Sequence, residues 1–350
     1  MTGTVGLVVN PGAARDVRRL TSLARTVDVH ERINAVARVL AGLAAARVER
    51  VLFMPEPSAI VSRALDLLAA IGAPAPAGGP PRVAPVHLPG EGLARDAAGT
   101  AAAASAMAEE GVDCVVTFGG DGTNRAVAAG WPGGLLVPLP GGTNNAFAVR
   151  AEPTAAGLAA GLFAAEPDAF PGLTRQAPSL EVHADGATPW AALVDVALVR
   201  GPWIGTHALW DPALLIEAVV TCPDPAASGL AGVAGMAPPA VRGDAVPSGR
   251  AVHLVFGEGG VEVLAPLGPG QLERVAIRSR RPLAVGEVVR SVPGAATVAF
   301  DGEREISLLP GTPVEVRPVP RGPHVLDVDG VLRAAAVRGD LVDRAPVPRR

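Results

Sequence analysis

CVVTFGGDGT at residues 114–123, followed by NRAVAA at residues 124–129, is the stretch that decides the fold. A short apolar run breaks into glycines and resumes as an alanine-rich segment, which is the pattern of a buried strand, a tight turn and a helix start. Gly119, Gly120 and Gly122 admit backbone angles closed to other residues and let main-chain N–H groups approach a ligand. Because the N-terminus of the following helix carries partial positive charge, this turn favours phosphate.

A second stretch, LLVPLPGGTNNAFAV at residues 135–149, repeats the strand, the glycine turn and the helix start. If the two strands lie parallel and close together in one sheet, both turns open at the same carboxyl edge, where α/β folds bind ligands. The sequence therefore predicts a phosphate- or nucleotide-binding site made by two consecutive turns. Its candidate residues in the second turn are Gly141, Gly142, Thr143, Asn144 and Asn145.

Asp121 is the only carboxylate of the first turn. Beside bound phosphates a carboxylate repels its neighbours unless it binds a metal ion or accepts a proton from an attacking hydroxyl, and the sequence leaves both roles open. Thr123 is available as a phosphate-binding hydroxyl or as the helix N-cap. The alternative is structural, because Asp-Gly between apolar runs is also a common hairpin turn and an aspartate can simply cap a helix.

GGDGT at residues 119–123 and GTNN at residues 142–145 resemble the motifs of a superfamily of ATP-dependent kinases. This superfamily contains NAD kinases, diacylglycerol and sphingosine-type lipid kinases and, more distantly, 6-phosphofructokinases. VVNP at 8–11 and RDVRRL at 15–20 are most similar to its branch of bacterial ATP-NAD kinases and acetoin-catabolism protein X. The resemblance implies an NAD kinase-like fold with ATP and Mg²⁺ as cofactors. It also implies phosphate transfer to a hydroxyl of a nucleotide-like acceptor, with NAD(H) the first candidate.

The resemblance implies roles for single residues as well. Asp121 would be catalytic, and Asn10, at the carboxyl end of the first expected strand, would contact the nucleotide. Arg15, Arg18 and Arg19 follow closely. One of them could neutralise nucleotide phosphates, for which a guanidinium is well shaped, or all three could lie on a solvated helix face.

Three carboxylates are expected to bind the substrate. Asp195 interrupts the apolar run at residues 192–199, and burying an unpaired charge costs several kcal/mol, so it needs a partner. It resembles the position of an Asn-acidic pair in NAD kinases, although Val194 replaces the asparagine; the alternative is a salt bridge with an arginine. Asp301 and Glu303 in AFDGE resemble an Asp-Gly-Glu signature of the family, and the alternative is a hairpin turn.

Two rival functions stay open. Lipid kinases of the superfamily usually end the second turn in Asn-Asp, and Asn145 stands where that aspartate belongs. A nucleotide-binding regulator without catalysis is the other rival, although the presence of Asp121 argues mildly against it. A dehydrogenase is disfavoured because neither loop gives Gly-x-Gly-x-x-Gly with an acidic residue about 20 positions on.

The amino-acid composition excludes several of the remaining classes of partner and binding motif. The net charge of −4 comes without a basic block, which implies neither nucleic acid nor an acidic membrane as partner. Every cationic side chain apart from histidine is arginine, so a Walker-type P-loop, which needs lysine, is excluded. Cys114 and Cys222 do not suggest a disulfide framework, and no long apolar run indicates a membrane span. We expect a cytoplasmic homo-oligomer that binds a small-molecule nucleotide, without integral membrane association.

The chain of 350 residues is long enough for two domains. Strands and helices alternate over residues 1–165, which predicts a doubly wound parallel α/β domain, with a helix capped by Ser58 among its elements. Short β-branched runs between turn residues over 166–324 predict a mostly antiparallel β-domain, in which 227–235 is read as a loop. Residues 325–345 are expected to return to the first domain.

Overall fold

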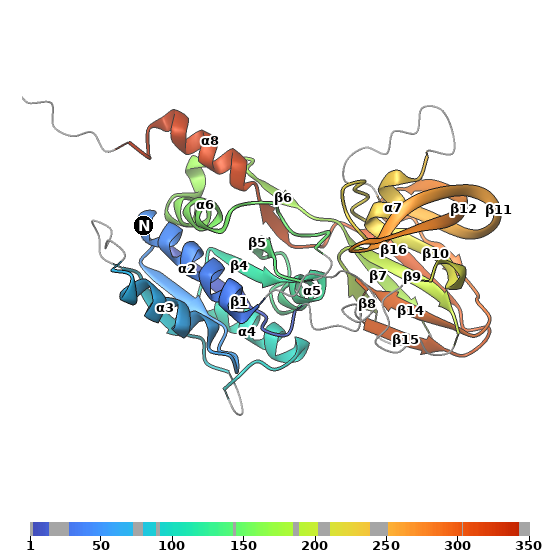
Figure 1. Cartoon of the computed structure of the whole chain (residues 1–350), viewed down its shortest axis with the longest axis horizontal. Helices are drawn as coiled ribbons and strands as arrows, with labels where there is room; N and C mark the ends of the chain where they lie inside the picture. Colours follow the sequence, from blue (N-terminus) through green and yellow to red (C-terminus); the bar gives the residue numbers. More distant parts are fainter. Residues whose placement is uncertain are drawn as a thin grey trace, which may run out of the picture.

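A computed structural model describes residues 3–13, 28–72, 80–88, 92–142, 145–184, 189–201, 211–238, 251–302 and 304–342. Figure 1 shows an α/β domain beside a domain built mostly of strands. The expected fold class is confirmed: the first domain holds a mainly parallel sheet and the second holds antiparallel sheets. Arg15, Arg18, Arg19, Thr143, Asn144 and Glu303 lie outside the described residues.

The sheet of the α/β domain has seven strands in the order β3-β2-β1-β4-β5-β17-β6. All neighbouring pairs are parallel except β17 with β6, which are antiparallel. The strands are β1 (Thr4–Val9), β2 (Arg50–Phe53), β3 (Arg82–Pro85), β4 (Cys114–Gly119), β5 (Leu135–Pro140), β6 (Thr174–Gln176) and β17 (His324–Leu326). The segment that contains β17 therefore comes back from the β-domain to extend the first sheet.

Helices cover both faces of this sheet. On one face lie α2 (Val29–Ala45), α3 (Ile60–Ala70), α6 (Pro153–Ala165) and α8 (Val328–Arg338), and on the other α4 (Ala97–Glu109) and α5 (Asp121–Gly130). A short 3₁₀ helix, η1 (Pro167–Ala169), follows α6. Val5, Leu7 and Val9 of β1 pack under the first group, whereas Val8 packs under the second. Successive residues of a strand thus pack under helices on opposite faces of the sheet. Because both faces are buried, these strands are continuously apolar in sequence.

The β-domain consists of two antiparallel sheets. The larger has the order β12-β11-β10-β9-β14-β15, and the smaller has the order β13-β16-β7-β8. Leu180 and Val316 of the smaller sheet share one apolar core with Leu198 and Phe300 of the larger sheet. The two sheets are therefore packed face to face. The strands of the larger sheet are β9 (Asp195–Arg200), β10 (Leu215–Val220), β11 (Ala251–Gly268), β12 (Gln271–Leu283), β14 (Ala296–Phe300) and β15 (Arg304–Leu308), and those of the smaller are β7 (Ser179–Ala184), β8 (Trp190–Ala192), β13 (Val289–Ser291) and β16 (Val314–Val319).

Local predictions fail at three places. Residues 190–200, expected as one run, divide into β8 and β9 in different sheets. Ser58 does not cap α3, because Ala59 holds the N-cap position with φ 50° and the carboxylate of Glu56 accepts hydrogen bonds from the N–H groups of Ser58 and Ile60. The expected loop at 227–235 contains the helix α7 (Leu230–Met236), which packs against β11. A 3₁₀ turn, η2 (Pro212–Leu214), leads into β10.

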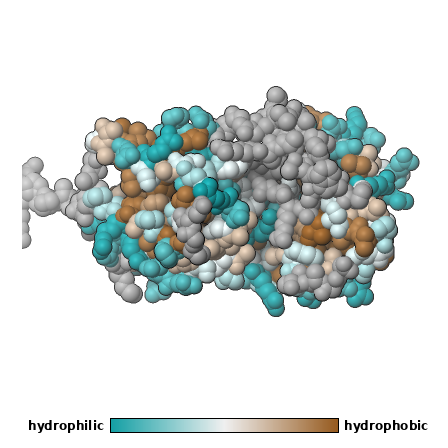
Figure 2. All heavy atoms as spheres, turned by 90° about the horizontal axis from the view of Figure 1, so that it is seen from below, coloured by the Kyte–Doolittle hydropathy of each residue, from teal (hydrophilic) through white to brown (hydrophobic). Residues whose placement is uncertain are grey.

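The face of the molecule drawn in Figure 2 shows small apolar areas broken by polar residues. In Figure 2 the brown patches on each domain are separated by teal and white residues. Among the helices that the structure describes, none is both long and apolar enough to span a bilayer.

Candidate functional site

The two glycine turns lie side by side, as the sequence predicts. β4 and β5 are parallel neighbours, and Gly119 is paired with Pro140 at their carboxyl ends. The N–H of Gly141 donates to the carbonyl of Gly119 over 2.9 Å. A Cβ at Gly141 would lie 2.8 Å from the nitrogen of Gly119, so the close approach of the turns requires glycine there. The shared edge of the sheet is therefore confirmed.

Asp121 connects the first turn to the second. It is the first residue of α5, after Gly120 at the N-cap position, and only 3% of it is exposed. Its Oδ2 accepts from the N–H of Ala146 at 3.1 Å, and its Oδ1 accepts from the N–H of Phe147 at 3.0 Å. These bonds use two of about four lone-pair positions of a carboxylate and fix the segment that follows the second turn.

Thr123 and Asn10 join the first turn to the end of β1. The Nδ2 group of Asn10 donates to Oγ1 of Thr123 at 2.9 Å, and Oδ1 of Asn10 accepts from the N–H of Gly12 at 2.8 Å. Thr123 is the third residue of α5 and Gly120 is the N-cap, so of its two alternatives the N-cap role is wrong and the phosphate-binding hydroxyl stays a prediction. A Cβ at Gly119 would lie 2.5 Å from Oγ1 of Thr123, which explains the glycine there.

Asn145 closes the second turn on itself. Its Oδ1 accepts from the N–H of Gly142 at 2.9 Å, and its Nδ2 donates to the carbonyl of Gly142 at 2.8 Å. The predicted contact of Asn145 with a nucleotide stays a prediction. What the structure adds is that the side chain sets the shape of the turn.

Two residues that were not predicted from the sequence hold the first turn and the end of β1. Arg32 of α2 is fully buried, and its guanidinium donates to the carbonyls of Asn10, at 2.8 Å, and Ala13. The available signal was a charged residue beside the apolar stripe of a helix. Asn124 is also buried: its Oδ1 accepts from the hydroxyl of Thr117 at 2.6 Å, and its Nδ2 donates to the carbonyl of Gly120 at 3.2 Å.

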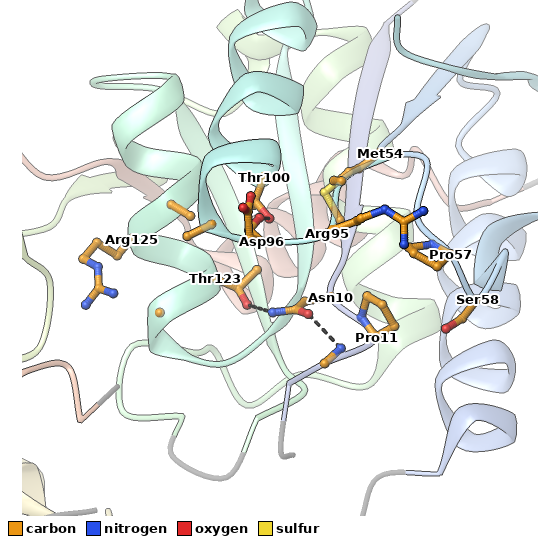
Figure 3. Close-up of a pocket in the computed structure, with 15 residues that line it drawn as sticks. Asn10, Pro11, Met54, Pro57, Ser58, Arg95, Asp96, Thr100, Thr123 and Arg125 are labelled. Carbon is orange, nitrogen blue, oxygen red and sulfur yellow. Dashed lines mark hydrogen bonds between the residues drawn. The ribbon is translucent and has the colours of Figure 1, made fainter. Parts of the chain in front are cut away.

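A pocket of about 460 Å³ opens beside the first turn (Figure 3). Asn10 and Thr123 meet on one side of it, and their hydrogen bond is drawn there. The segment after β2 forms the opposite side, and the beginning of α4 lies between the two. The lining residues include Gly122, Met54, Pro57, Ser58, Arg95, Asp96, Thr100 and Arg125. The pocket combines hydroxyls and two guanidinium groups, which suit a phosphorylated ligand, with the carboxylate of Asp96, which accepts from the N–H of Gly99 at the start of α4.

Asp301 lies in the turn between β14 and β15, so the hairpin interpretation of this motif is correct for its local structure. Its backbone has φ 50°, and its side chain is fully buried. Oδ1 accepts hydrogen bonds from the N–H groups of Leu193, Val194 and Asp195 at 3.1, 2.8 and 3.3 Å. Arg125 of α5 donates to Oδ2 at 3.0 Å. Binding of substrate by Asp301 stays a prediction.

Asp195 begins β9 and is buried, next to Asp301. The N–H of Asp301 donates to the carbonyl of Asp195 at 3.0 Å. A bend at Leu193 and Val194 precedes it and ends the apolar run that the sequence suggested was continuous. The proposed contact of Asp195 with the substrate is likewise untested.

Cys222 lies where the two domains meet. Burial is the main cause that raises the pKa of its thiol, and the carboxylates of Asp121 and Asp301 raise it further, against the opposite effects of Thr221 and Arg175. Residues of the first turn and of the β14–β15 turn therefore both lie within electrostatic range of this thiol. No motif in the sequence indicates this placement of Cys222.

Metal binding by protein side chains alone has no support in the described ranges, where no group of three or more His, Cys, Asp or Glu side chains could hold an ion. Mg²⁺ usually keeps several waters and binds through one or two carboxylates together with substrate phosphates. Asp121 beside the two turns fits that kind of site.

The chain is similar to known proteins in sequence. Residues 178–321 match the family described as "Acetoin catabolism protein X C-terminal domain". Acetoin catabolism protein X of Cupriavidus necator is 34% identical over 351 residues, which cover 98% of this chain and 95% of that protein.

Similar solved structures are much more distant. Yeast NADH kinase complexed with NADH is 12% identical with a TM-score of 0.46, covering 100% of this chain and 90% of that one. A putative diacylglycerol kinase from Bacillus anthracis is 14% identical with a TM-score of 0.41, covering 92% and 96%. An NAD kinase from Archaeoglobus fulgidus in complex with ATP is 10% identical with a TM-score of 0.36, covering 97% and 100%. Likenesses this weak have no bearing on function.

The Cupriavidus protein is a different case, because its identity extends over nearly the whole length of both chains. The match includes the β-domain that the family description covers. The chain therefore belongs to the acetoin catabolism protein X family.

Proposed function

We propose that this protein transfers a phosphoryl group from ATP to a hydroxyl of a nucleotide-like acceptor, with NAD(H) as the first candidate. The observation that carries the proposal is the contact between the two glycine turns, with Asp121 buried at their junction. Turns at the carboxyl edge of a parallel sheet, the first of them at a helix N-terminus, suit polyphosphate. In such a reaction the protein mainly positions the reactants and neutralises charge.

The donor phosphates would lie against Gly119, Gly120 and Gly122, with Thr123 as hydroxyl donor. The pocket bounded by Asn10, Arg95 and Thr100 is continuous with Gly122 and Thr123, and it is the place for the rest of the donor. Arg32 supports this assignment because it fixes the carbonyl of Asn10 without entering the pocket.

Asp121 would accept the proton of the attacking hydroxyl. The N–H groups of Ala146 and Phe147 hold its carboxylate in one orientation, which is what a positioned base needs. Mg²⁺ bound with ATP would neutralise phosphate charge, and Asp121 is the carboxylate that could contact it. The acceptor would enter from the β-domain, where Asp195 and Asp301 lie across from α5.

The test is a transfer assay with purified full-length chain, Mg-ATP labelled at the γ-phosphate, and NAD, NADH, diacylglycerol and a sphingoid base in parallel. We expect label in NADP or NADPH. Label in a lipid would assign the alternative lipid kinase activity. Tight binding of ATP and NAD by calorimetry without any labelled product would identify a regulator and contradict the proposal.

A further inference from the structure

A second pocket lies in the β-domain and is rich in arginine. It has a volume of about 750 Å³ and is lined by Arg200, Arg274 and Arg278, among other residues. We call these three residues and the space between them the arginine pocket. Its accessible apolar lining includes Pro212 and Ala213.

The arginine pocket is separate from the glycine turns. β9 runs from Asp195, beside the Arg125–Asp301 ion pair, to Arg200 in the arginine pocket. At about 3.3 Å per residue these two ends lie roughly 17 Å apart along the strand. β10 runs the opposite way, and its first residue, Leu215, is the one that lines the pocket. A ligand here would therefore not be part of the proposed phosphoryl-transfer site.

Few side chains of the protein form ion pairs or hydrogen bonds with the guanidinium groups of this pocket. Within the described ranges, no ion pair or side-chain hydrogen bond engages the guanidinium of Arg200 or of Arg278. Arg274 is 3.8 Å from Glu262, but the two side chains are 71% and 62% exposed, so the pair is weak. Glu258 is the one carboxylate among the described lining residues. The three arginines thus face two carboxylates, those of Glu258 and Glu262, and the pocket keeps an excess of positive charge in a chain whose net charge is −4.

Backbone geometry makes room for this arrangement. The pairing of β11 with β12 is irregular between Phe256 and Val261, which interrupts the ladder next to the pocket. Gly257 has φ 134°, and a Cβ there would lie 3.1 Å from Cδ of Arg278. Glycine therefore lets the arginine side chain pass close to the strand, and Ala276 beside it also occupies little space.

We propose that the arginine pocket binds a small organic anion, with its phosphate or carboxylate group on the guanidinium groups and its apolar body against Pro212 and Ala213. Guanidinium groups match both kinds of anion in geometry and charge. A long polyanion such as nucleic acid is disfavoured, because the exposed carboxylates of Glu258 and Glu262 flank the arginines and would repel an extended phosphate chain, whereas a small anion needs only the guanidinium groups.

The test is calorimetric titration of the full-length chain with phenyl phosphate and, separately, with inorganic phosphate. Phenyl phosphate should bind more tightly than inorganic phosphate, since only its ring can contact the apolar lining of Pro212 and Ala213. The double variant Arg200→Gln/Arg278→Gln should weaken phenyl phosphate binding at least about tenfold, because each charge-assisted hydrogen bond contributes substantially to affinity. Both substitutions are on exposed side chains, and thermal unfolding should show an intact fold.

Two control variants separate this site from the glycine turns. Arg290→Gln changes an exposed arginine elsewhere in the β-domain, and Arg95→Gln changes the pocket beside the first turn. Neither control variant should weaken the binding of phenyl phosphate to the arginine pocket. The proposal is overturned if phenyl phosphate does not bind, if the double variant binds it normally, or if only Arg95→Gln weakens binding. A preference for a DNA oligonucleotide over phenyl phosphate would overturn it as well.

Discussion

Arg125 and Asp301 connect the helix after the first glycine turn to the β-domain. Their ion pair spans 3.0 Å, with side chains 13% and 0% exposed, and the same guanidinium nitrogen donates to the carbonyl of Phe300 at 3.2 Å. Arg125 also lines the pocket beside the first turn. One side chain thus contacts both the proposed donor site and the domain that would present the acceptor.

We expect Arg125→Met to destabilise the protein by about 1–3 kcal/mol, because the buried carboxylate of Asp301 loses its cation but keeps its backbone donors. Arg38→Met should cost about 1 kcal/mol or less, since Arg38 and Glu152 are 49% and 50% exposed. Denaturant unfolding of both variants measures the difference. Equal effects for the two arginines would show that the buried pair has no special role.

Coupling between the pair can be measured directly. Unfolding free energies of Arg125→Met, Asp301→Asn and the double variant form a double-mutant cycle, in which residues in contact couple by about 0.5–3 kcal/mol. Strict additivity of the two substitutions would contradict the contact.

The contact between the turns predicts the effect of a single methyl group. Gly141→Ala places a Cβ 2.8 Å from the nitrogen of Gly119, so one turn must move away from the other. We expect a loss of about 1–3 kcal/mol in the free energy of unfolding and weaker ATP binding. Thermal unfolding and calorimetry with ATP measure the two effects.

Gly294→Ala is the matched control for that substitution. No atom lies within 4 Å of a Cβ at Gly294, and its φ is not in the left-handed region. It should leave both stability and ATP binding unchanged. If Gly141→Ala behaved like Gly294→Ala, the two turns would not be in contact.

Much of the fold could be predicted because its signals are local. The strand–turn–helix pattern of residues 114–129 and the apolar runs of the first domain depend on neighbours in sequence. Predictions failed where the structure depends on a contact with a distant residue or on a hydrogen bond between a side chain and main-chain N–H groups. Asp301, more than a hundred residues further along the chain, binds the N–H groups at the break between β8 and β9. Glu56 lies three residues before Ala59, the N-cap of α3. Its carboxylate accepts a hydrogen bond from the N–H of Ile60 and so caps the helix.

The candidate site shows the same division. The glycines and Asp121 carry a recognisable motif, and the structure brings them together. Arg32 was missed because its role, holding the carbonyls of Asn10 and Ala13, depends on how α2 packs beside β1. Pairing of Asp301 with Arg125 was missed because the two residues come from different domains.

Acid should weaken the β-domain through Glu181. Hydrogen bonds from His183, at 2.7 Å, and from Arg317, at 2.9 Å, lower the pKa of this carboxyl, with His183 the larger cause. A depressed carboxyl pKa stabilises the fold above the unfolded-state pKa and loses this effect as pH falls through the folded-state pKa. The Glu181→Gln variant should therefore be less stable than wild type by about 1 kcal/mol or less near neutral pH, and the difference should shrink in acid.

Glu315→Gln controls for a charge change in the same sheet. Glu315 pairs with Arg290 across β13 and β16, but these side chains are 38% and 77% exposed. We expect this variant to stay close to wild type at every pH. If the difference in stability between Glu181→Gln and wild type became larger as the pH falls, the proposed stabilisation by the ionised carboxylate of Glu181 would be contradicted.

The most direct measurement is phosphate transfer from γ-labelled Mg-ATP to NAD by wild type, Asp121→Asn and Asp329→Asn. Asp329 pairs with Arg333 on the exposed side of α8 and is the matched control. The asparagine at 121 keeps only one acceptor for the N–H groups of Ala146 and Phe147, so each variant is also checked by thermal unfolding. We predict that folded Asp121→Asn is slower by about 10²- to 10⁴-fold while Asp329→Asn is unchanged. Transfer by Asp121→Asn at the wild-type rate would contradict the proposed mechanism.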